Sequence, residues 1–304
     1  MEILFGVVKV IVVAAIVVAV CKLFWWIIVG ILTIPGPRND KMLSKFREKG
    51  FIAHRGLHDR TARFPENSMA AFRNAIDNGY GIELDVQTTK DNKVVVFHDD
   101  KLNRICGDEA KGAVINECTF AELSKYRLLG GDEKIPLLSD VFDLIMRRGE
   151  NTPLVIEIKS APNEILTCKL VDELISDSNV DFPVCIKSFS PKVVRWFYKN
   201  SPDTLRGILA SDYKRSKKRH KKLYERIFCY FQTNLLFNSY CKPNFVSYNC
   251  SQFDQKNVRK IFSTNKELGK SGWTFKLKDT TKETLTQIRA QASDVDMIVF
   301  ELEK

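Results

Sequence analysis

Phe51-Ile-Ala-His-Arg-Gly56 begins the stretch, extending to Asp99, that decides the fold of this chain. A short apolar run leads to His54 and Arg55, and Gly56 allows the backbone to turn sharply after them. The sequence therefore predicts a short buried strand with two polar side chains at its end.

A helix is predicted after this turn. Either Asn67 or Ser68 can act as its N-cap, because apolar side chains at helical spacing follow both of them. Gly79 is placed to end the helix. The opening of the stretch is thus a strand, a tight turn and a helix.

The next predicted strand, Ile82–Val86, carries two carboxylates. Glu83 and Asp85 lie two residues apart, so both point to one side of the strand while the apolar residues face the other. Like charges this close repel each other unless a cation or a proton lies between them. Lys93–Phe97 follows after a link too short for a crossover, which predicts an antiparallel hairpin that returns His98 to the level of Asp85.

These segments resemble the glycerophosphodiester phosphodiesterase family. Each short motif is weak evidence alone, but four of them occur in the family's order and spacing. They are His54-Arg55-Gly56, Pro65-Glu66-Asn67-Ser68, Glu83-Leu84-Asp85 and His98-Asp99. The likeness continues more weakly through Ile135–Leu138, Val155–Lys159, Ser188-Phe189 and Trp273-Thr274.

Apolar strand-like runs alternate with helical stretches along the rest of the chain. This alternation predicts an α/β fold, and on the residues alone a doubly wound sheet and a (β/α)8 barrel both remain open. The family resemblance implies the (β/α)8 TIM barrel. The predicted strands are 51–54, 82–86, 153–158, 183–188, 205–209, 244–248, 272–277 and 296–301, and the predicted helices are 119–128, 138–148, 163–175, 191–199, 253–268 and 280–292.

Three carboxylates are candidate metal ligands. Glu83, Asp85 and Glu157 lie at the ends of predicted strands, where barrel enzymes place their sites. An all-oxygen set suits a hard cation, Ca²⁺ or Mg²⁺, and does not suit zinc. Glu157 and Lys159 also point to one face of an apolar run, which an exposed ion pair on the surface would not explain. The resemblance implies that the three carboxylates hold a divalent ion.

Two histidines are candidate catalytic residues. The resemblance implies that His54 and His98 act as general acid and general base, without deciding which residue has which role. Arg55 and Lys159 are placed to bind phosphoryl oxygens, Arg55 through its guanidinium fork and Lys159 as a point charge.

The other two histidines of the chain, His58 in a polar loop and His220 in a run of charges, are interpreted as bystanders.

The chain departs from the family's pattern at the ends of two strands. After Trp-Thr the family usually has a hydrophobic residue and Asn, whereas here the sequence is Trp273-Thr274-Phe275-Lys276. The family's last strand usually ends in Thr-Asp, and here it reads Val299-Phe300-Glu301-Leu302. Both changes fall at the far rim of the expected mouth, so we expect them to affect substrate preference.

Composition limits the possible partners. The chain has 304 residues and is 44% hydrophobic, enough for one large domain with a substantial core. Its net charge of +10 favours an anionic partner such as lipid headgroups or a phosphorylated substrate. Nucleic acid is not expected, because no small nucleic-acid-binding module or zinc-finger spacing is recognisable. The eight cysteines lack CxxC pairing and read as reduced thiols, which favours the cytoplasmic side.

The N-terminal segment predicts a single transmembrane anchor. Residues 10–34 contain Lys22 as their one charged residue and are long enough to cross a bilayer as a helix. A signal peptide is disfavoured because the apolar run is too long and lacks a small-residue cleavage site. A hydrophobic hairpin entering one leaflet is the alternative. Pro35-Gly36-Pro37 ends the segment, which gives an anchor and linker over 1–37 and a barrel over 38–304.

Basic residues follow the predicted span within 38–49, and almost none precede it. By the positive-inside rule this arrangement predicts that the barrel lies on the cytoplasmic side of the membrane. The protein is therefore expected to be a single-pass membrane protein.

An insert around 212–240 is the second informative stretch. Its basic run, Lys214–Lys222, leads into an aromatic-rich amphipathic segment that ends near Phe237. A solvated charge run is the simpler interpretation, but basic residues beside aromatic ones also suit an anionic membrane surface.

These observations predict a membrane-anchored, divalent-metal-dependent phosphodiesterase. Its expected reaction is hydrolysis of a glycerophosphodiester to an alcohol and glycerol 3-phosphate. One alternative keeps the chemistry but takes a membrane lysophospholipid, as a lysophospholipase D does. A second alternative is a non-catalytic protein that binds lipid surfaces.

Overall fold

The computed structural model describes residues 1–59, 61–148, 151–212, 222–253, 258–259, 262–263 and 268–303, without the side chains of residues 2–4. The basic run 214–221, which includes His220, lies outside these residues, and so does most of the helix predicted over 253–268.

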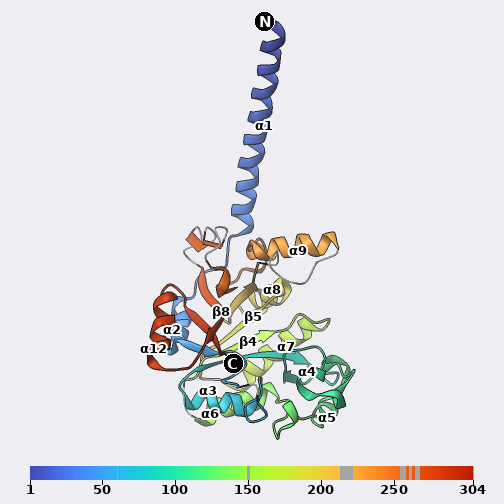
Figure 1. Ribbon diagram of the computed structural model, residues 1–304. Coiled ribbons are helices and arrows are strands. Elements are labelled where there is room, and N and C mark those ends of the chain that lie inside the picture. Colours follow the sequence, from blue (N-terminus) through green and yellow to red (C-terminus); the bar gives the residue numbers. More distant parts are fainter. Residues whose placement is uncertain are drawn as a thin grey trace.

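Within the described residues, eight parallel strands close into a barrel (Figure 1). The first strand, β1, pairs with β2 on one side and with the last strand, β9, on the other, which closes the cylinder. This closure confirms the (β/α)8 barrel and rules out the doubly wound sheet. The strands are β1 (Phe51–Ala53), β2 (Gly81–Thr88), β4 (Leu154–Ile158), β5 (Val184–Ser188), β6 (Leu205–Ala210), β7 (Phe245–Asn249), β8 (Gly269–Leu277) and β9 (Met297–Leu302).

The predicted hairpin is confirmed. The strand β3 (Val94–Val96) runs antiparallel to β2, with Val86 opposite Val96. The amide of Phe97 donates to the carbonyl of Asp85, 2.9 Å away, so His98 does return to the level of Asp85.

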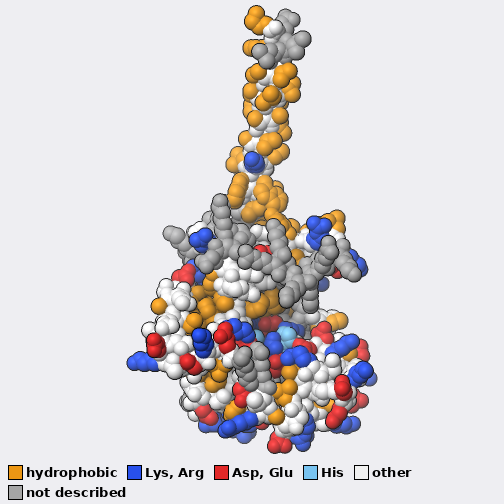
Figure 2. Space-filling view, viewed as in Figure 1, with side chains coloured by type: hydrophobic (Ala, Val, Ile, Leu, Met, Phe, Trp, Pro, Cys, Tyr) orange, Lys and Arg blue, Asp and Glu red, His pale blue; other side chains and the backbone are white. Residues whose placement is uncertain are grey.

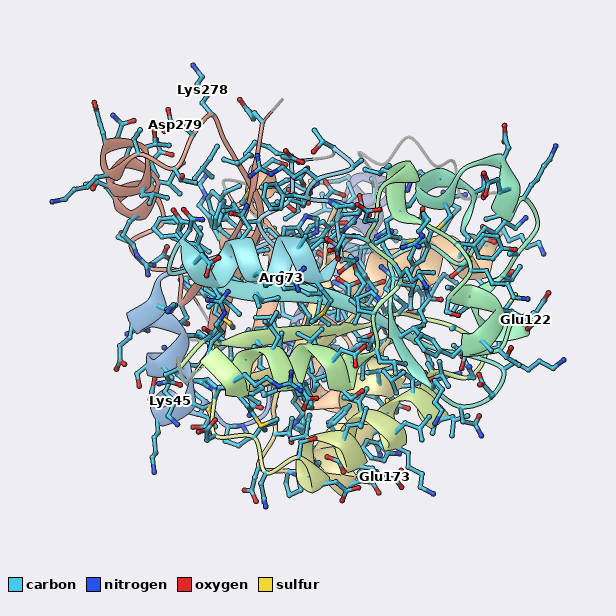
Figure 3. The ribbon with its side chains drawn as sticks, turned by 90° about the horizontal axis from the view of Figure 1, so that it is seen from below. Lys45, Arg73, Glu122, Glu173, Lys278 and Asp279 are labelled. Carbon is cyan, nitrogen blue, oxygen red and sulfur yellow. The ribbon has the colours of Figure 1, made fainter. Side chains whose placement is uncertain are left out.

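Helices cover the outside of the barrel, and most of the longer ones bury an apolar face against it. Charged side chains such as Lys45, Glu122 and Glu173 point outward, away from the strands (Figure 3). Ser68 is the N-cap of α3, because its hydroxyl accepts from the amide of Ala71 at 3.1 Å. The longer helices are α3 (Met69–Asp77), α6 (Leu138–Arg148), α7 (Glu164–Asp177), α8 (Pro191–Asn200), α9 (Leu223–Thr233) and α12 (Lys282–Gln291).

The helix predicted over 119–128 is wrong in extent. A capping box starts the helix α5 (Phe120–Leu123), but a turn at Leu128–Gly130 follows, where Leu129 has a φ of +51°. This part of the chain, between β3 and α6, folds around its own small apolar cluster and also contains the short helix α4 (Asn103–Cys106). Tight turns let the apolar side chains of this segment pack on one another, which one continuous helix would not allow.

The helix α2 (Asp40–Lys49) closes the amino-terminal end of the barrel. Its Leu43 and Phe46 are fully buried among inward-facing strand residues such as Phe245 and Val299. The opposite, carboxyl end of the strands is therefore the open end, where the candidate site lies.

The helix α1 (Glu2–Leu32) extends away from the barrel (Figure 1). Its segment Phe5–Leu32 has a mean hydropathy of 2.7, and its most apolar part is exposed among the described residues, so it is long and apolar enough to cross a membrane. The residues that follow α1 lie against the barrel. Gly36 donates its amide to the carbonyl of Pro243, and a Cβ at Gly36 would lie 2.5 Å from the carbonyl oxygen of Lys242.

Candidate active site

The turn after β1 has the backbone conformation that its glycine requires. Arg55 and Gly56 have φ values of +55° and +76°. A Cβ at Gly56 would lie 2.9 Å from the backbone of Ala71 in α3, so only glycine fits there. The turn directs the amide of Arg55 onto Glu83, whose Oε2 accepts it at 3.0 Å.

The three predicted carboxylates converge. Glu83, Asp85 and Glu157 are buried, and each offers an oxygen within 4.8 Å of the others. The strand register explains this, because Asp85 of β2 lies directly opposite Glu157 of β4. Asn67 holds Asp85 in place by donating its side-chain amide to Oδ2 at 3.0 Å.

Three cations surround these carboxylates. Arg55 Nε lies 3.3 Å from Asp85 Oδ2, and Lys159 Nζ lies 2.9 Å from Glu157 Oε1. Burial opposes the ionisation of Asp85, but Lys159 and Arg55 outweigh it and hold the pKa of Asp85 far below its usual range. Burial likewise opposes the charge on Lys159, yet Asp85 and Glu157 raise the pKa of its ammonium group. The predicted phosphate-binding residues therefore lie beside the acidic cluster and are charged.

The third cation, Lys187, was not predicted. It lies opposite Glu157 in the strand register, is 2% exposed, and places Nζ 2.8 Å from Glu83 Oε1. The one sequence signal for it was a charged residue inside the short apolar strand β5. That signal gains meaning only when the register is known.

His54 and His98 lie at this same open end of the barrel, and each contacts a carboxylate through Nδ1. His54 Nδ1 is 3.1 Å from Glu301 Oε2, and His98 Nδ1 is 2.5 Å from Asp99 Oδ1. A carboxylate beside Nδ1 favours the tautomer with its proton on that atom, which leaves Nε2 as a proton acceptor. His54 Nε2 faces the acidic cluster, 4.0 Å from Glu83 Oε2.

The two positions that depart from the family pattern pair with each other. Lys276 Nζ lies 2.8 Å from Glu301 Oε2, the same oxygen that contacts His54. Lys276 and Glu301 therefore lie beside the candidate catalytic residue His54. The sequence had placed them at the far rim of the mouth, farther from the histidines.

A network of ion pairs runs from His98 to Arg55, the residue that follows His54 in the sequence. Arg55 Nη1 donates to Glu66 Oε1 at 2.8 Å, and Arg104 Nη2 donates to the same oxygen at 2.6 Å. Arg104 also pairs with Asp99, which contacts His98. Arg104, in the four-residue helix α4, was not predicted from the sequence, and only its place in the fold identifies it.

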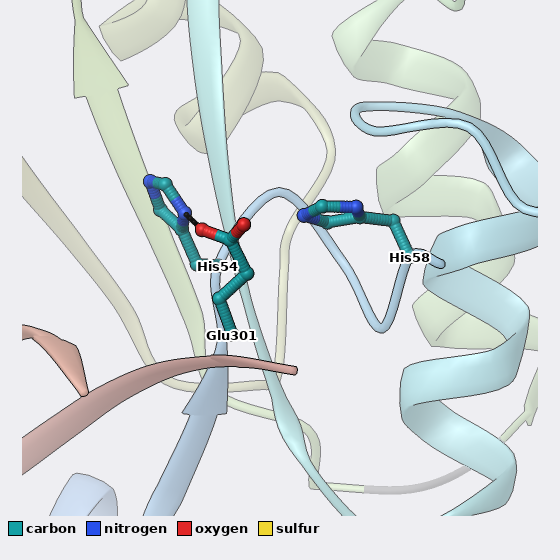
Figure 4. A group of neighbouring side chains, drawn as sticks. All are labelled: His54, His58 and Glu301. Carbon is teal, nitrogen blue, oxygen red and sulfur yellow. Dashed lines mark hydrogen bonds and ion pairs between the residues drawn. The ribbon is translucent and has the colours of Figure 1, made fainter. Parts of the chain in front are cut away.

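His58 is part of the mouth, although the sequence suggested a bystander in a polar loop. It is 5% exposed, and the Glu301 carboxylate lies between its ring and that of His54 (Figure 4). Burial lowers the pKa of His58 to about 4, so its ring is neutral. The residues of this mouth line a cavity of about 420 Å³, and Figure 2 shows histidine atoms among acidic and basic side chains in a hollow of the surface.

The acidic cluster fits a hard divalent cation. Three buried carboxylates offer only oxygen atoms, which is the donor chemistry of Ca²⁺ and Mg²⁺ sites. Three such groups this close together need compensating positive charge, which Arg55, Lys159 and Lys187 supply in this structure.

Comparison with known proteins gives the family. A family model described as the glycerophosphoryl diester phosphodiesterase family matches residues 54–289. A glycerophosphodiester phosphodiesterase from Bacillus altitudinis is 33% identical over 172 residues, which cover 53% of this chain and 66% of that protein. The human protein named lysophospholipase D GDPD1 is 31% identical over 186 residues, which cover 57% of this chain and 55% of that protein. The chain thus spans less than two thirds of the length of these curated relatives.

Solved structures share the fold. A phosphodiesterase from Oleispira antarctica, in complex with the product sn-glycerol-3-phosphate, superposes with a TM-score of 0.62 at 22% identity, covering 82% of this chain and 92% of that one. A glycerophosphodiester phosphodiesterase from Parabacteroides distasonis gives 0.58 at 21% identity, covering 82% and 91%. The family model covers most of the chain, including both candidate histidines and all three carboxylates, and the protein is therefore a member of the glycerophosphoryl diester phosphodiesterase family.

Proposed function

We propose that this protein hydrolyses glycerophosphodiesters to an alcohol and glycerol 3-phosphate with the help of a divalent cation. The observation that carries the proposal is the position of His54 and His98, each held by a carboxylate at the open end of the barrel that contains the three buried carboxylates. The names of the relatives and the product bound in one structural neighbour support the same reaction.

Binding of the phosphodiester falls to the cations of the site. Arg55 and Lys159 attract its two non-bridging oxygens, which share one negative charge, and Asp85 holds both side chains in place. A Ca²⁺ or Mg²⁺ ion held by Glu83, Asp85 and Glu157 would neutralise a phosphodiester oxygen and make phosphorus more electrophilic.

Proton transfer falls to the two histidines. Water attacks phosphorus, and one histidine takes a proton from that water at Nε2. The other histidine, which begins with both ring nitrogens protonated, gives its Nε2 proton to the departing alcohol oxygen as the P–O bond breaks. Glu301 and Asp99 orient the two rings for these transfers. After the products leave, one ring loses its extra proton to solvent and the other regains a proton from solvent, which returns both rings to their starting states.

The test uses the purified full chain in detergent with glycerophosphocholine as substrate. Turnover that a chelator abolishes and that Ca²⁺ or Mg²⁺ restores is expected. His54→Ala and His98→Ala are each expected to lower kcat by roughly 10²–10⁴-fold. Full activity in both variants would refute the acid–base assignment, and a folded wild type that turns over no diester would favour the lipid-surface binding protein instead.

A membrane lysophospholipid is the second candidate substrate. An apolar groove of about 780 Å³ lies along α9, lined by Tyr224, Ile227, Phe228, Phe231 and Phe237, and it offers a place for a single acyl chain. The mammalian relatives named lysophospholipase D support this reading. A kcat/KM for lysophosphatidylcholine well above that for glycerophosphocholine would support it, and equal values would not.

We further infer that residues 1–37 anchor the protein as a single span and that residues 38–304 form the catalytic unit, with the insert at 212–240, on the cytoplasmic side. The basic residues of 38–49 support this topology. Protease digestion of sealed microsomes tests it, since a cytoplasmic barrel is cut without detergent and a lumenal one is protected.

A further inference from the structure

The helix α9 exposes an apolar surface outside the candidate site. Leu223, Tyr224 and Ile227 are 70%, 63% and 51% exposed, and Phe228 and Tyr230 are exposed as well. Because residues three and four apart share one side of a helix, Tyr224, Ile227 and Phe228 form a continuous apolar stripe. A stripe of aromatic and branched side chains is costly to leave in water.

The far end of α9 is attached to the open end of the barrel. Gln232 donates its side-chain amide to the carbonyls of Phe189 and Leu209, at 2.8 and 3.1 Å. Thr233 donates to the carbonyl of Ser211. These carbonyls lie at the carboxyl ends of β5 and β6, so α9 is fixed to the rim of the mouth that contains His54 and His98.

The same segment also fixes the foot of α1. The short helix α10 (Asn238–Cys241) follows α9, and the side-chain amide of Asn238 donates to the carbonyl of Thr33 at 3.3 Å. Lys242 and Pro243 then contact the linker at Ile34 and Gly36. Figure 1 shows the result: α9 runs across the surface from which α1 rises, roughly perpendicular to α1.

The surroundings of α9 have the chemistry of a membrane interface. Lys222 and Arg226 are exposed on or beside the helix, and hydrophobic and basic side chains gather there near the foot of α1 (Figure 2). The guanidinium of Arg195 stacks on the exposed ring of Tyr240, with 4.4 Å from Cζ to the ring centroid. Tyrosine beside arginine and lysine is typical of the boundary between lipid headgroups and acyl chains.

We propose that α9 lies in the interface of the bilayer that α1 crosses, with its apolar stripe among the acyl chains and its basic residues at anionic headgroups. This proposal rests on the membrane anchoring inferred above. In this arrangement α1 crosses the bilayer and α9 lies along its surface, and the two are joined through Thr33 and Asn238. Together they fix the orientation of the barrel on the membrane. The rim at β5 and β6 then faces the lipid, so a lysophospholipid reaches the mouth without leaving the bilayer.

The experiment uses the full chain in vesicles of phosphatidylcholine mixed with phosphatidylglycerol. The test variant is Leu223→Asp with Tyr230→Asp, which places two charges on the exposed apolar surface of α9 outside its groove. The matched control is Ile165→Asp with Leu166→Asp on α7, a pair of exposed apolar residues that lies farther from α1. Two quantities are measured: amide hydrogen exchange of residues 223–233, and turnover of lysophosphatidylglycerol in the vesicles beside that of soluble glycerophosphocholine.

In the vesicles, the amides of α9 are expected to exchange about tenfold more slowly in the wild type than in the test variant. The control variant should exchange like the wild type. The apparent KM for the lipid substrate should rise about tenfold in the test variant, with glycerophosphocholine turnover unchanged. Equal exchange in wild type and test variant would overturn the proposal, and so would protection of α9 that appears only on adding monomeric lysolipid or at high protein concentration. The exchange measurement does not depend on catalysis. A protein without activity would therefore contradict the proposed function, and the exchange of α9 would still test its position in the membrane.

Discussion

Glu301 Oε2 accepts from both His54 Nδ1, at 3.1 Å, and Lys276 Nζ, at 2.8 Å. One carboxylate oxygen therefore orients a candidate catalytic ring and is itself held by a cation. Glu301 is almost fully buried, while Lys276 is about half exposed. The position of the pair is therefore set by Glu301.

Glu301→Gln is expected to lower kcat by about 10- to 100-fold with little change in KM, because an amide supports both tautomers of His54 and no longer stabilises its charged form. Glu301→Asp should recover part of the activity. Kinetics with glycerophosphocholine provide the measurement, and Glu283→Gln on the exposed face of α12 is the control. A change confined to KM would mean that Glu301 binds substrate and does not position His54.

Lys187→Met is expected to raise the affinity for a divalent ion and to lower the stability of the metal-free protein. Removing the ammonium group leaves Glu83 and Glu157 short of a counter-charge, which should cost about 3 kcal/mol of stability in chelator. A divalent ion should restore that charge and bind about tenfold more tightly than to the wild type. Chemical unfolding in chelator and calorimetric titration with Ca²⁺ measure the two effects.

The control for this variant is Lys270→Met, which removes an ion pair between Lys270 and the exposed Asp294. It should change stability by less than about 1 kcal/mol and leave metal affinity unaltered. Unchanged metal affinity in Lys187→Met would show that Lys187 does not compete with the ion.

Gly56→Ala and Gly79→Ala form a matched pair, because both glycines have a φ of +76°. A Cβ at Gly79 meets nothing within 4 Å, so its substitution should cost about 1 kcal/mol from backbone strain alone. A Cβ at Gly56 meets the backbone of Ala71 at 2.9 Å, so we expect a loss of at least about 3 kcal/mol and lower activity. Denaturant unfolding compares them, and equal losses would contradict a steric role for Gly56.

Acid is expected to destabilise the protein through His58. The pKa of this ring falls from its ordinary 6.5 to about 4 on burial, so between these values the unfolded chain binds a proton that the folded chain does not. The contribution is complete above the unfolded pKa and is lost as the pH falls, by about 2 kcal/mol between about pH 7.5 and about pH 5. His58→Gln should flatten the stability–pH curve by that amount. A variant curve parallel to that of the wild type would assign the acid loss to other groups.

Alternation along single strands made part of the site predictable. Glu83 and Asp85 were placed on one face by their spacing, and the short link after them fixed the hairpin that carries His98. These are local rules of two-residue periodicity, and the structure follows them.

Other residues depend on relations that one sequence does not contain. Lys187 meets Glu157 because of the register between two strands, and Arg104 reaches Asp99 because a satellite cluster folds between β3 and α6. His58 does lie in a loop, as the sequence suggested, but the fold buries that part of the loop. In the sequence, Glu301 and Lys276 stand out only as departures from the family's pattern. Their pairing becomes evident once β8 and β9 are seen to be neighbours in the barrel.

That closure also constrains how the protein is made. Phe51 of β1 pairs with Ile298 of β9, so the first strand of the cylinder completes its pairing only after β9 has been synthesised. During synthesis α1 and α2 leave the ribosome well before this partner exists, and β1 then has one unpaired edge. A chain interrupted before β9 would therefore lose the seam of the barrel and Glu301 together, and β1 would present an open sheet edge.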